Sequence, residues 1–200
     1  MTNMPVELYT DGSTLDQQGK PPHASGLAYI IRYWDTPEGA DMPTPTVVER
    51  AQGYRNSTNN RMEIMAGIQG LQMIIEKVQN GEWKGVTQIN LASDSEYFCN
   101  AIMQKWVEKW RSNGWMTAGF KNIQPKPVRN KDLWEIMLGI IDQMRNLGIT
   151  LTMVHVAGHS GHEFNEKCDQ LAKDAAKDTV NHKIDTGYEQ NRQPYGGNRQ

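Results

Sequence analysis

The strongest constraint on the fold is that two predicted strands, far apart in the sequence, each end in an aspartate. Residues 6–9 alternate between apolar and polar side chains, which predicts a strand that ends in the carboxylate of Asp11. Residues 87–94 form a second such segment, which ends in Asp94. If the two strands are parallel neighbours, both carboxylates emerge at the sheet edge where ligands of open α/β sheets bind. Each aspartate could instead cap a turn, which is the simpler interpretation of either residue alone.

The other predicted elements build an α/β fold around these strands. Residues 26–31 and 47–51 follow the first strand with no helix between them, so we expect an antiparallel meander. The strand at 87–94 leads directly into a helix, as in a βαβ unit, and residues 150–156 alternate as a last strand. Apolar residues at helical spacing predict helices at residues 61–79, 96–109, 132–146 and 165–177.

Composition indicates a single folded domain. The 200 residues are enough for a proper core, 38% of them are apolar, and the formal net charge is −2. From residue 179 onward the sequence turns to Asn, Gln, Gly and charged residues without apolar periodicity. We therefore predict one folded domain over residues 1–178 and a disordered polar tail over residues 179–200.

The cysteines and the N-terminal residues bear on the compartment. Cys99 and Cys168 form no spaced pair with histidine that resembles a zinc site, and they suggest no disulfide framework. A reducing compartment is the default for such a chain. Residues 1–5 lack the basic and apolar regions of a signal peptide, and no apolar stretch approaches the roughly 20 residues of a membrane span. We expect a cytoplasmic protein without a membrane partner.

Four acidic residues occupy positions from which a shared site could form. Asp11 and Asp94 end strands, whereas Glu63 and Asp169 lie on predicted helices beside apolar stripes. Glu63 could instead complete a capping box with Asn60, and Asp169 could be a solvated helix residue. Clustered carboxylates repel one another unless hard cations bind between them. Mg²⁺ suits such a site, and two ions about 4 Å apart can activate a water and stabilise a leaving oxygen in phosphodiester cleavage.

A basic stretch that contains several tryptophans indicates a local surface for nucleic acid. Residues 100–131 contain seven Lys or Arg and one acidic residue, Glu108, although the chain as a whole is slightly acidic. Trp106, Trp110 and Trp115 could touch sugars of a bound strand. They could also pack between two helices, and their helical spacing favours packing for at least two of them.

Four motifs resemble the ribonuclease H family, bacterial type 1, and they occur in family order over about residues 4–178. They are Tyr-Thr-Asp-Gly-Ser at 9–13, Thr-Asn-Asn-Arg-Met-Glu at 58–63, Ser-Asp-Ser at 93–95, and Gly-His-Ser-Gly-His followed by Asn-Glu-Lys-Cys-Asp within 158–169. The resemblance implies a ribonuclease H-like α/β fold: a five-stranded mixed sheet, three antiparallel strands then two parallel ones, with helices on both faces and a basic helical protrusion. It also implies an endoribonuclease that cuts the RNA strand of RNA–DNA hybrids and leaves 5′-phosphate and 3′-hydroxyl ends.

The resemblance also assigns roles to individual residues of a monomeric enzyme. Asp11, Glu63, Asp94 and Asp169 would bind two Mg²⁺ ions, with Mn²⁺ as a substitute. His159 would assist proton transfer or product release. The RNA–DNA hybrid would contact residues from three parts of the chain. These nucleic-acid-binding residues are Gly12, Thr58, Asn59, Asn60, Lys109, Trp110, Arg111, Lys126 and Arg129.

Two other functions remain open. One is a non-catalytic module that binds hybrids on the same fold, although the presence of all four carboxylates argues against it. The other is a different nuclease or an integrase of this fold, which the Asn59–Asn60 pair disfavours. Glu96 departs from the family, which often has Gln there, because an ionised acid cannot donate a hydrogen bond to the minor groove. The long loop predicted at 35–46 is a second departure, and it suggests no role.

Overall fold

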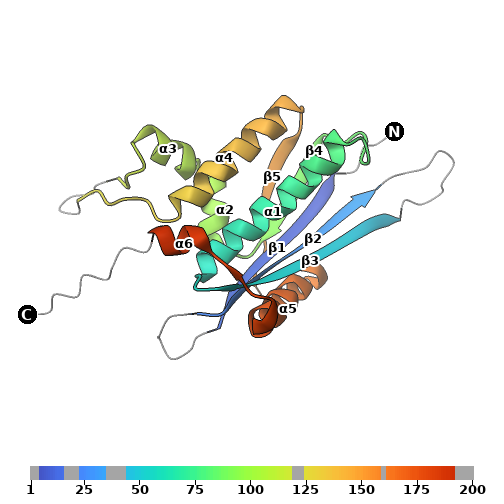
Figure 1. The fold of residues 1–200 in the computed structure, drawn as a ribbon. Helices are drawn as coiled ribbons and strands as arrows, with labels where there is room; N and C mark the ends of the chain where they lie inside the picture. The colour runs from blue at the N-terminus through green and yellow to red at the C-terminus, as the bar shows by residue number, and fades with distance from the viewer. Residues whose placement is uncertain (1–4, 16–22, 35–43, 119–123, 159–160, 192–200) are drawn as a thin grey trace, which may run out of the picture.

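The computed structural model describes residues 5–15, 23–34, 44–118, 124–158 and 161–191, and these residues form a twisted mixed sheet with helices on both faces (Figure 1). The described strands lie in the order β5-β4-β1-β2-β3-β6. β1 pairs antiparallel with β2, and β2 with β3, whereas β1, β4 and β5 run parallel to one another. The strands are β1 (Val6–Thr14), β2 (Ser25–Trp34), β3 (Pro45–Arg55), β4 (Gln88–Ser93), β5 (Thr150–His155) and β6 (Lys183–Ile184).

The predicted mixed sheet is confirmed, but the predicted number of five strands was wrong. The additional strand, β6, pairs parallel with the end of β3, where Tyr54 lies opposite Lys183. The predicted loop at 35–46 lies mostly outside the described residues, and β3 begins within it at Pro45.

The helices cover the two faces of the sheet unequally (Figure 1). On one face α1 packs on β1 and β2, with α4 beside it, and on the other face α5 crosses β1, β2 and β3. The single helix predicted at 96–109 was wrong, because Lys105 adopts a left-handed conformation with φ of 54° and separates two helices. The helices are α1 (Asn59–Gln79), α2 (Glu96–Met103), α3 (Trp106–Ser112), α4 (Lys131–Asn146), α5 (Glu163–Lys177) and α6 (Thr186–Asn191).

Strand register brings the two predicted strand-end aspartates to one edge of the sheet. The parallel pairing of β1 with β4 ends where Tyr9 lies opposite Ala92. β1 itself continues to Thr14 and pairs with β2, so the prediction that β1 ends at Asp11 was wrong. Asp11 nevertheless lies past the last residue pair with β4, and Asp94 follows the end of β4. Both carboxylates therefore sit at the carboxyl end of the parallel pair, as the sequence predicted.

The apolar core lies mainly between the sheet and α1. Apolar residues at helical spacing in the predicted helix at 61–79 are buried there, among them Ile64, Ile68, Leu71 and Ile75. Ile136, an apolar residue of the helix predicted at 132–146, remains 45% exposed. A smaller apolar cluster under α5 contains Tyr9, Ile30, Ala92 and Cys168.

The disordered tail predicted from residue 179 was wrong for residues 179–191. After α5 the chain forms a 3-10 turn (Thr179–Asn181), then β6 and α6. The segment attaches through polar contacts, which is why its sequence shows no apolar periodicity. Asp185 is only 4% exposed, and Gln52 Nε2 donates to the carbonyl oxygen of Asn181 at 2.8 Å. Within the described part of the chain, none of the helices has the length and apolar character needed to cross a lipid bilayer.

Glycines allow α1 to lie close to its neighbours. A Cβ atom on Gly67 would come within 2.5 Å of the ring atom Cζ of Phe98, and one on Gly70 within 2.5 Å of Leu8 Cδ1. Both neighbours are fully buried, so they have little freedom to move. The two glycines therefore lower the helix propensity of α1 but allow it to pack closely against α2 and β1.

Substituting alanine for glycine at two helical positions separates packing from propensity. We expect Gly67→Ala to lower the free energy of unfolding by about 1–3 kcal/mol, because the new methyl overlaps the Phe98 ring. Gly139→Ala is the matched control, since a Cβ on this exposed helical glycine meets nothing within 4 Å, and it should raise stability by about 0.5–1 kcal/mol. Urea unfolding measures both effects. Equal effects of the two substitutions would refute the packing argument.

Candidate active site

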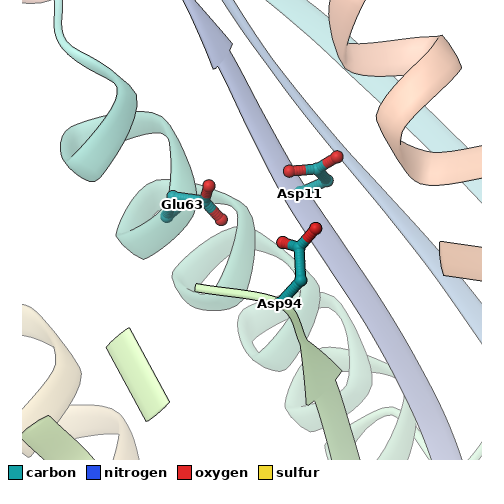
Figure 2. Close-up of side chains that lie close together, drawn as sticks. All are labelled: Asp11, Glu63 and Asp94. Carbon is teal, nitrogen blue, oxygen red and sulfur yellow. The ribbon is translucent and has the colours of Figure 1, made fainter. Parts of the chain in front are cut away.

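Three carboxylates from three different elements converge at the sheet edge (Figure 2). Asp11 projects from β1, Glu63 from the first turns of α1, and Asp94 follows β4. One carboxylate oxygen from each lies within 4.8 Å of the other two. The simpler interpretation of Asp11 and Asp94 as separate turn caps does not account for this arrangement.

Burial and mutual repulsion make this cluster electrostatically costly. Asp11 and Glu63 are each only 4% exposed, whereas Asp94 is half-buried. Burial, followed by the charge of Asp94, raises the pKa of the Asp11 carboxyl to about 7 from an ordinary value of 3.8. Burial, followed by the charge of Asp11, raises the pKa of Glu63 well above its ordinary value. A bound cation would offset both the burial of the charged carboxylates and the repulsion between them.

The hydrogen bonds of the cluster leave one buried oxygen, Glu63 Oε2, without a partner. The Gly12 backbone N–H donates to Asp11 Oδ1 at 2.7 Å, and Asn59 Nδ2 donates to Glu63 Oε1 at 3.0 Å. Glu63 Oε2 is buried and has no hydrogen-bond partner among the described residues. An unpartnered buried carboxylate oxygen is costly in the absence of a cation. The donor set consists of oxygens alone, which suits a hard divalent ion such as Mg²⁺.

The fourth predicted carboxylate, Asp169, does not belong to this group of three. It lies half-buried on α5, and Lys173 Nζ, one turn further along the helix, donates to its Oδ2 at 2.6 Å. The charge of Asp169 nevertheless contributes to raising the pKa of Asp11, so Asp169 interacts electrostatically with the cluster. Asp169 was interpreted as either a site residue or a solvated helix residue, and the structure shows it in an ion pair with Lys173.

The start of α1 presents the predicted asparagines to solvent. Thr58 is the N-cap residue, and its hydroxyl accepts from the Arg61 backbone N–H, so the capping box between Asn60 and Glu63 was wrong. Asn59 and Asn60 are both exposed at the first turn of the helix. Asn59 also orients Glu63, a role that the sequence did not reveal.

Gly12 has a packing role that the sequence interpretation missed. A Cβ atom at this position would lie 2.5 Å from the Glu63 backbone nitrogen and 2.7 Å from Met62 Cβ. The glycine therefore lets α1 approach β1 closely enough to bring Glu63 beside Asp11. Its predicted contact with a nucleic-acid strand stays a prediction.

The loop after β5 begins beside the cluster. A Cβ atom on Gly158 would lie 3.2 Å from Asp94 Oδ2, and His155 Nε2 lies 3.3 Å from the Asp94 carbonyl oxygen. His159, predicted to act in catalysis, falls outside the described residues. Glu96, the departure from the family, lies in the first turn of α2, where an acid interacts favourably with the helix dipole.

The basic protrusion contains α3 and the segment that leads into α4 (Figure 1). Trp110 packs among the rings of Tyr97, Trp106 and Trp134, with ring centroids 5.9–6.5 Å apart, so the predicted packing role holds for Trp106 and Trp110. Trp110 also borders two surface hollows, of about 480 Å³ and about 280 Å³. Lys109 lines the larger hollow, and Lys126, Arg129 and Asn60 line the smaller one, whereas Arg111 is exposed on α3.

The fold is a mixed α/β sheet, and an acidic cluster lies at the ends of two of its parallel strands. These two features place the chain among the α/β proteins that have a carboxylate site for cations. The model of the RNase H family matches residues 3–177. Ribonuclease H of Desulforamulus reducens is 43% identical over 172 residues, which is 86% of this chain and 87% of the relative. Ribonuclease H of Oleidesulfovibrio alaskensis is 37% identical over 168 residues, which is 84% and 88% of the two chains. The chain belongs to the ribonuclease H family.

Solved structures agree on the fold. LC9-RNase H1, described as a type 1 RNase H with the type 2 active-site motif, is 25% identical and gives a TM-score of 0.65 over 95% of this chain and 81% of its own. LC11-RNase H1, solved in complex with an RNA/DNA hybrid, is 18% identical and gives a TM-score of 0.53 over 88% of this chain and 99% of its own. The second likeness concerns the fold alone.

The raised pKa values predict that stability without metal ions falls as the pH rises. A carboxyl with a raised pKa stabilises the fold fully below its ordinary pKa, and this contribution is lost as the pH rises through the folded value. For Asp11 the window runs from about 4 to about 7. In EDTA, urea unfolding should give lower stability at pH 8 than at pH 5, and Mg²⁺ should restore part of the loss.

Asp11→Asn tests the origin of this pH dependence. Because the amide carries no charge, the variant should be more stable than the unaltered protein at pH 8 in EDTA, by roughly 1 kcal/mol or more. Asp142→Asn is the control, since Asp142 lies on the exposed surface of α4. A variant at position 11 that keeps the full pH dependence would contradict the assignment.

Proposed function

We propose that the protein is an endoribonuclease that hydrolyses the RNA strand of RNA–DNA hybrids by two-metal-ion catalysis and leaves 5′-phosphate and 3′-hydroxyl ends. The observation that carries the proposal is the convergence of Asp11, Glu63 and Asp94 within 4.8 Å in a chain of the ribonuclease H family. Two buried free cysteines suit a reducing compartment, and we propose that the enzyme acts in the cytoplasm as a monomer.

The metal site would consist of Asp11, Glu63 and Asp94, with Asp169 as the fourth ligand. Bound Mg²⁺, or Mn²⁺ in its place, supplies a Lewis acid that lowers the pKa of a water and stabilises the leaving oxygen. Gly12 and Asn59 hold the carboxylates of Asp11 and Glu63 in position through the hydrogen bonds at 2.7 and 3.0 Å. For Asp169 to bind an ion, its ion pair with Lys173 would have to open. For His159 we propose proton transfer or product release, on the family resemblance.

Substrate selection would depend on the turn before α1 and on the basic protrusion. Asn59 and Asn60 are exposed beside Glu63, and their amides can both donate to and accept from ribose 2′-hydroxyls. Thr58 uses its hydroxyl as the helix cap, and we propose that it also lies near a DNA phosphate. Cations around the two hollows beside Trp110 would bind phosphates of the DNA strand. These cations are Lys109, Lys126 and Arg129, and we propose the same role for Arg111, which is exposed on α3.

A catalytic role is favoured over a purely binding role by the electrostatics of the cluster. A binding module gains nothing from buried carboxylates that repel each other and the phosphates of the ligand. A bound cation would give the buried and unpartnered Glu63 Oε2 a partner. The same cost is expected at a catalytic site, where perturbed pKa values serve the chemistry.

Asp11→Asn should abolish cleavage while the fold persists, because it removes a metal ligand and almost no volume. We expect the cleavage rate on a labelled RNA–DNA hybrid with Mg²⁺ to fall by more than about 100-fold. Asp142→Asn should keep the unaltered rate. Cleavage by the Asp11 variant at the unaltered rate would contradict the site assignment. Duplex RNA and duplex DNA of the same sequence complete the panel, and cleavage of duplex DNA alone would overturn the proposed function.

Lys126→Ala should weaken hybrid binding and reduce its salt dependence. Removal of one phosphate contact lowers the slope of log affinity against log salt by about 1. The control is Lys84→Ala, because Lys84 is exposed and follows the C-terminal end of α1, the end away from Asn59 and Asn60. Fluorescence anisotropy in EDTA at several salt concentrations measures the slope. An unchanged slope for the Lys126 variant would exclude this residue from phosphate binding.

A further inference from the structure

A buried ion network joins the C-terminal segment (residues 179–191) to the turn before α1 (residues 56–58). Asp185, at the end of β6, accepts hydrogen bonds from Arg61 Nε at 2.6 Å and from Arg61 Nη2 at 2.9 Å. Its Oδ2 also accepts from the Ser57 hydroxyl at 2.6 Å, and its Oδ1 from the Tyr188 backbone N–H at 3.0 Å. Ser57, Arg61 and Asp185 are 0%, 2% and 4% exposed. The network is therefore shielded from solvent and from screening by salt.

The same arginine reaches the base of the protrusion. Arg61 donates to both carboxylate oxygens of Asp132, in the first turn of α4, at 3.0 and 2.7 Å, and to Asn130 Oδ1 at 3.5 Å. Burial raises the pKa of Asp132, but the hydrogen bonds and charge of Arg61 outweigh this effect and lower it. Asn130 follows Arg129, so one side chain links the turn, the C-terminal segment and the basic surface.

The packing around the network leaves little room for movement. A Cβ atom on Gly187 would lie 2.6 Å from Arg61 Nη2 and would also overlap the Asp132 carboxylate. Asn56, which has a left-handed backbone with φ of 53°, donates through Nδ2 to Glu189 Oε1 at 3.3 Å. The C-terminal segment therefore holds the turn at Asn56 and at Ser57, immediately before Thr58.

We propose that Asp185 is a positioning residue for hybrid recognition, which acts through Ser57 and Arg61 to fix the turn before α1 and the first turn of the helix, where Thr58, Asn59 and Asn60 lie. The inference rests on the proposed function. The turn has to place two exposed amides against ribose hydroxyls while Asn59 also holds Glu63. Fixing the turn in advance lowers the entropic cost of binding. The C-terminal segment is thus part of the recognition surface, although it supplies none of the proposed substrate contacts.

Ser57→Ala is the sharper of two test variants, because it removes one hydrogen bond to Asp185 and leaves the ion pair with Arg61 in place. We expect its affinity for an RNA–DNA hybrid in EDTA to fall about 3- to 10-fold, while its affinity for duplex DNA of the same sequence stays unchanged. With Mg²⁺, KM for the hybrid should rise and kcat should not change. Mg²⁺ affinity, measured by calorimetry on the free protein, should equal that of the unaltered protein.

Asp185→Asn should show the same pattern with a larger loss of hybrid affinity, and Asp178→Asn is its matched control. Asp178 lies exposed just before the C-terminal segment, and among the described residues its carboxylate accepts a hydrogen bond only from Asn181 Nδ2. If Asp185→Asn does not fold, Ser57→Ala decides. Equal losses on hybrid and duplex DNA, a fall in kcat alone, or no loss beyond that of Asp178→Asn would overturn the proposal. Failure of the unaltered protein to bind the hybrid would instead overturn the proposed function.

Discussion

The repulsion among three clustered carboxylates, two of them buried, is the constraint on which the rest of the molecule depends. Asp11, Glu63 and Asp94 are held within 4.8 Å although each charge disfavours the others. They stay together because the elements that carry them pack for other reasons. β1 and β4 are central strands of the sheet, and the missing side chain of Gly12 lets α1 lie directly on β1. The stability of the apolar core thus offsets the electrostatic cost of the site.

Much of this architecture could be predicted from sequence, because the periodicity of apolar residues and the order of motifs can be recognised in short stretches of chain. The alternation before Asp11 and Asp94 predicted two strands, and their parallel pairing places both acids at one edge. The apolar stripe of α1 predicted its buried face. The family motifs identified Glu63, which periodicity alone leaves ambiguous between a cap and a ligand. Each of these predictions depends on a few neighbouring residues, or on a motif whose residues are all present in the sequence.

The parts that could not be predicted depend on contacts between distant residues or on competition between neighbours. The left-handed Lys105 divides a segment whose composition suits one continuous helix. Asp169 forms an ion pair with Lys173, a contact that the helical pattern alone did not reveal. Residues 179–191 were taken as disordered because they lack apolar spacing, yet buried polar contacts of Asp185 and His182 hold them in place. Buried hydrogen bonds can order a segment that its hydropathy pattern predicts to be a disordered tail.

The distance in sequence between Ser57 and Asp185 has a consequence for how the molecule matures. The two residues are 128 positions apart, so the chain must close a long loop before their hydrogen bond can form. Asp11, Glu63 and Asp94 all come from the first 94 residues of the chain. The support of the turn before α1, by contrast, depends on the ordering of nearly the whole chain.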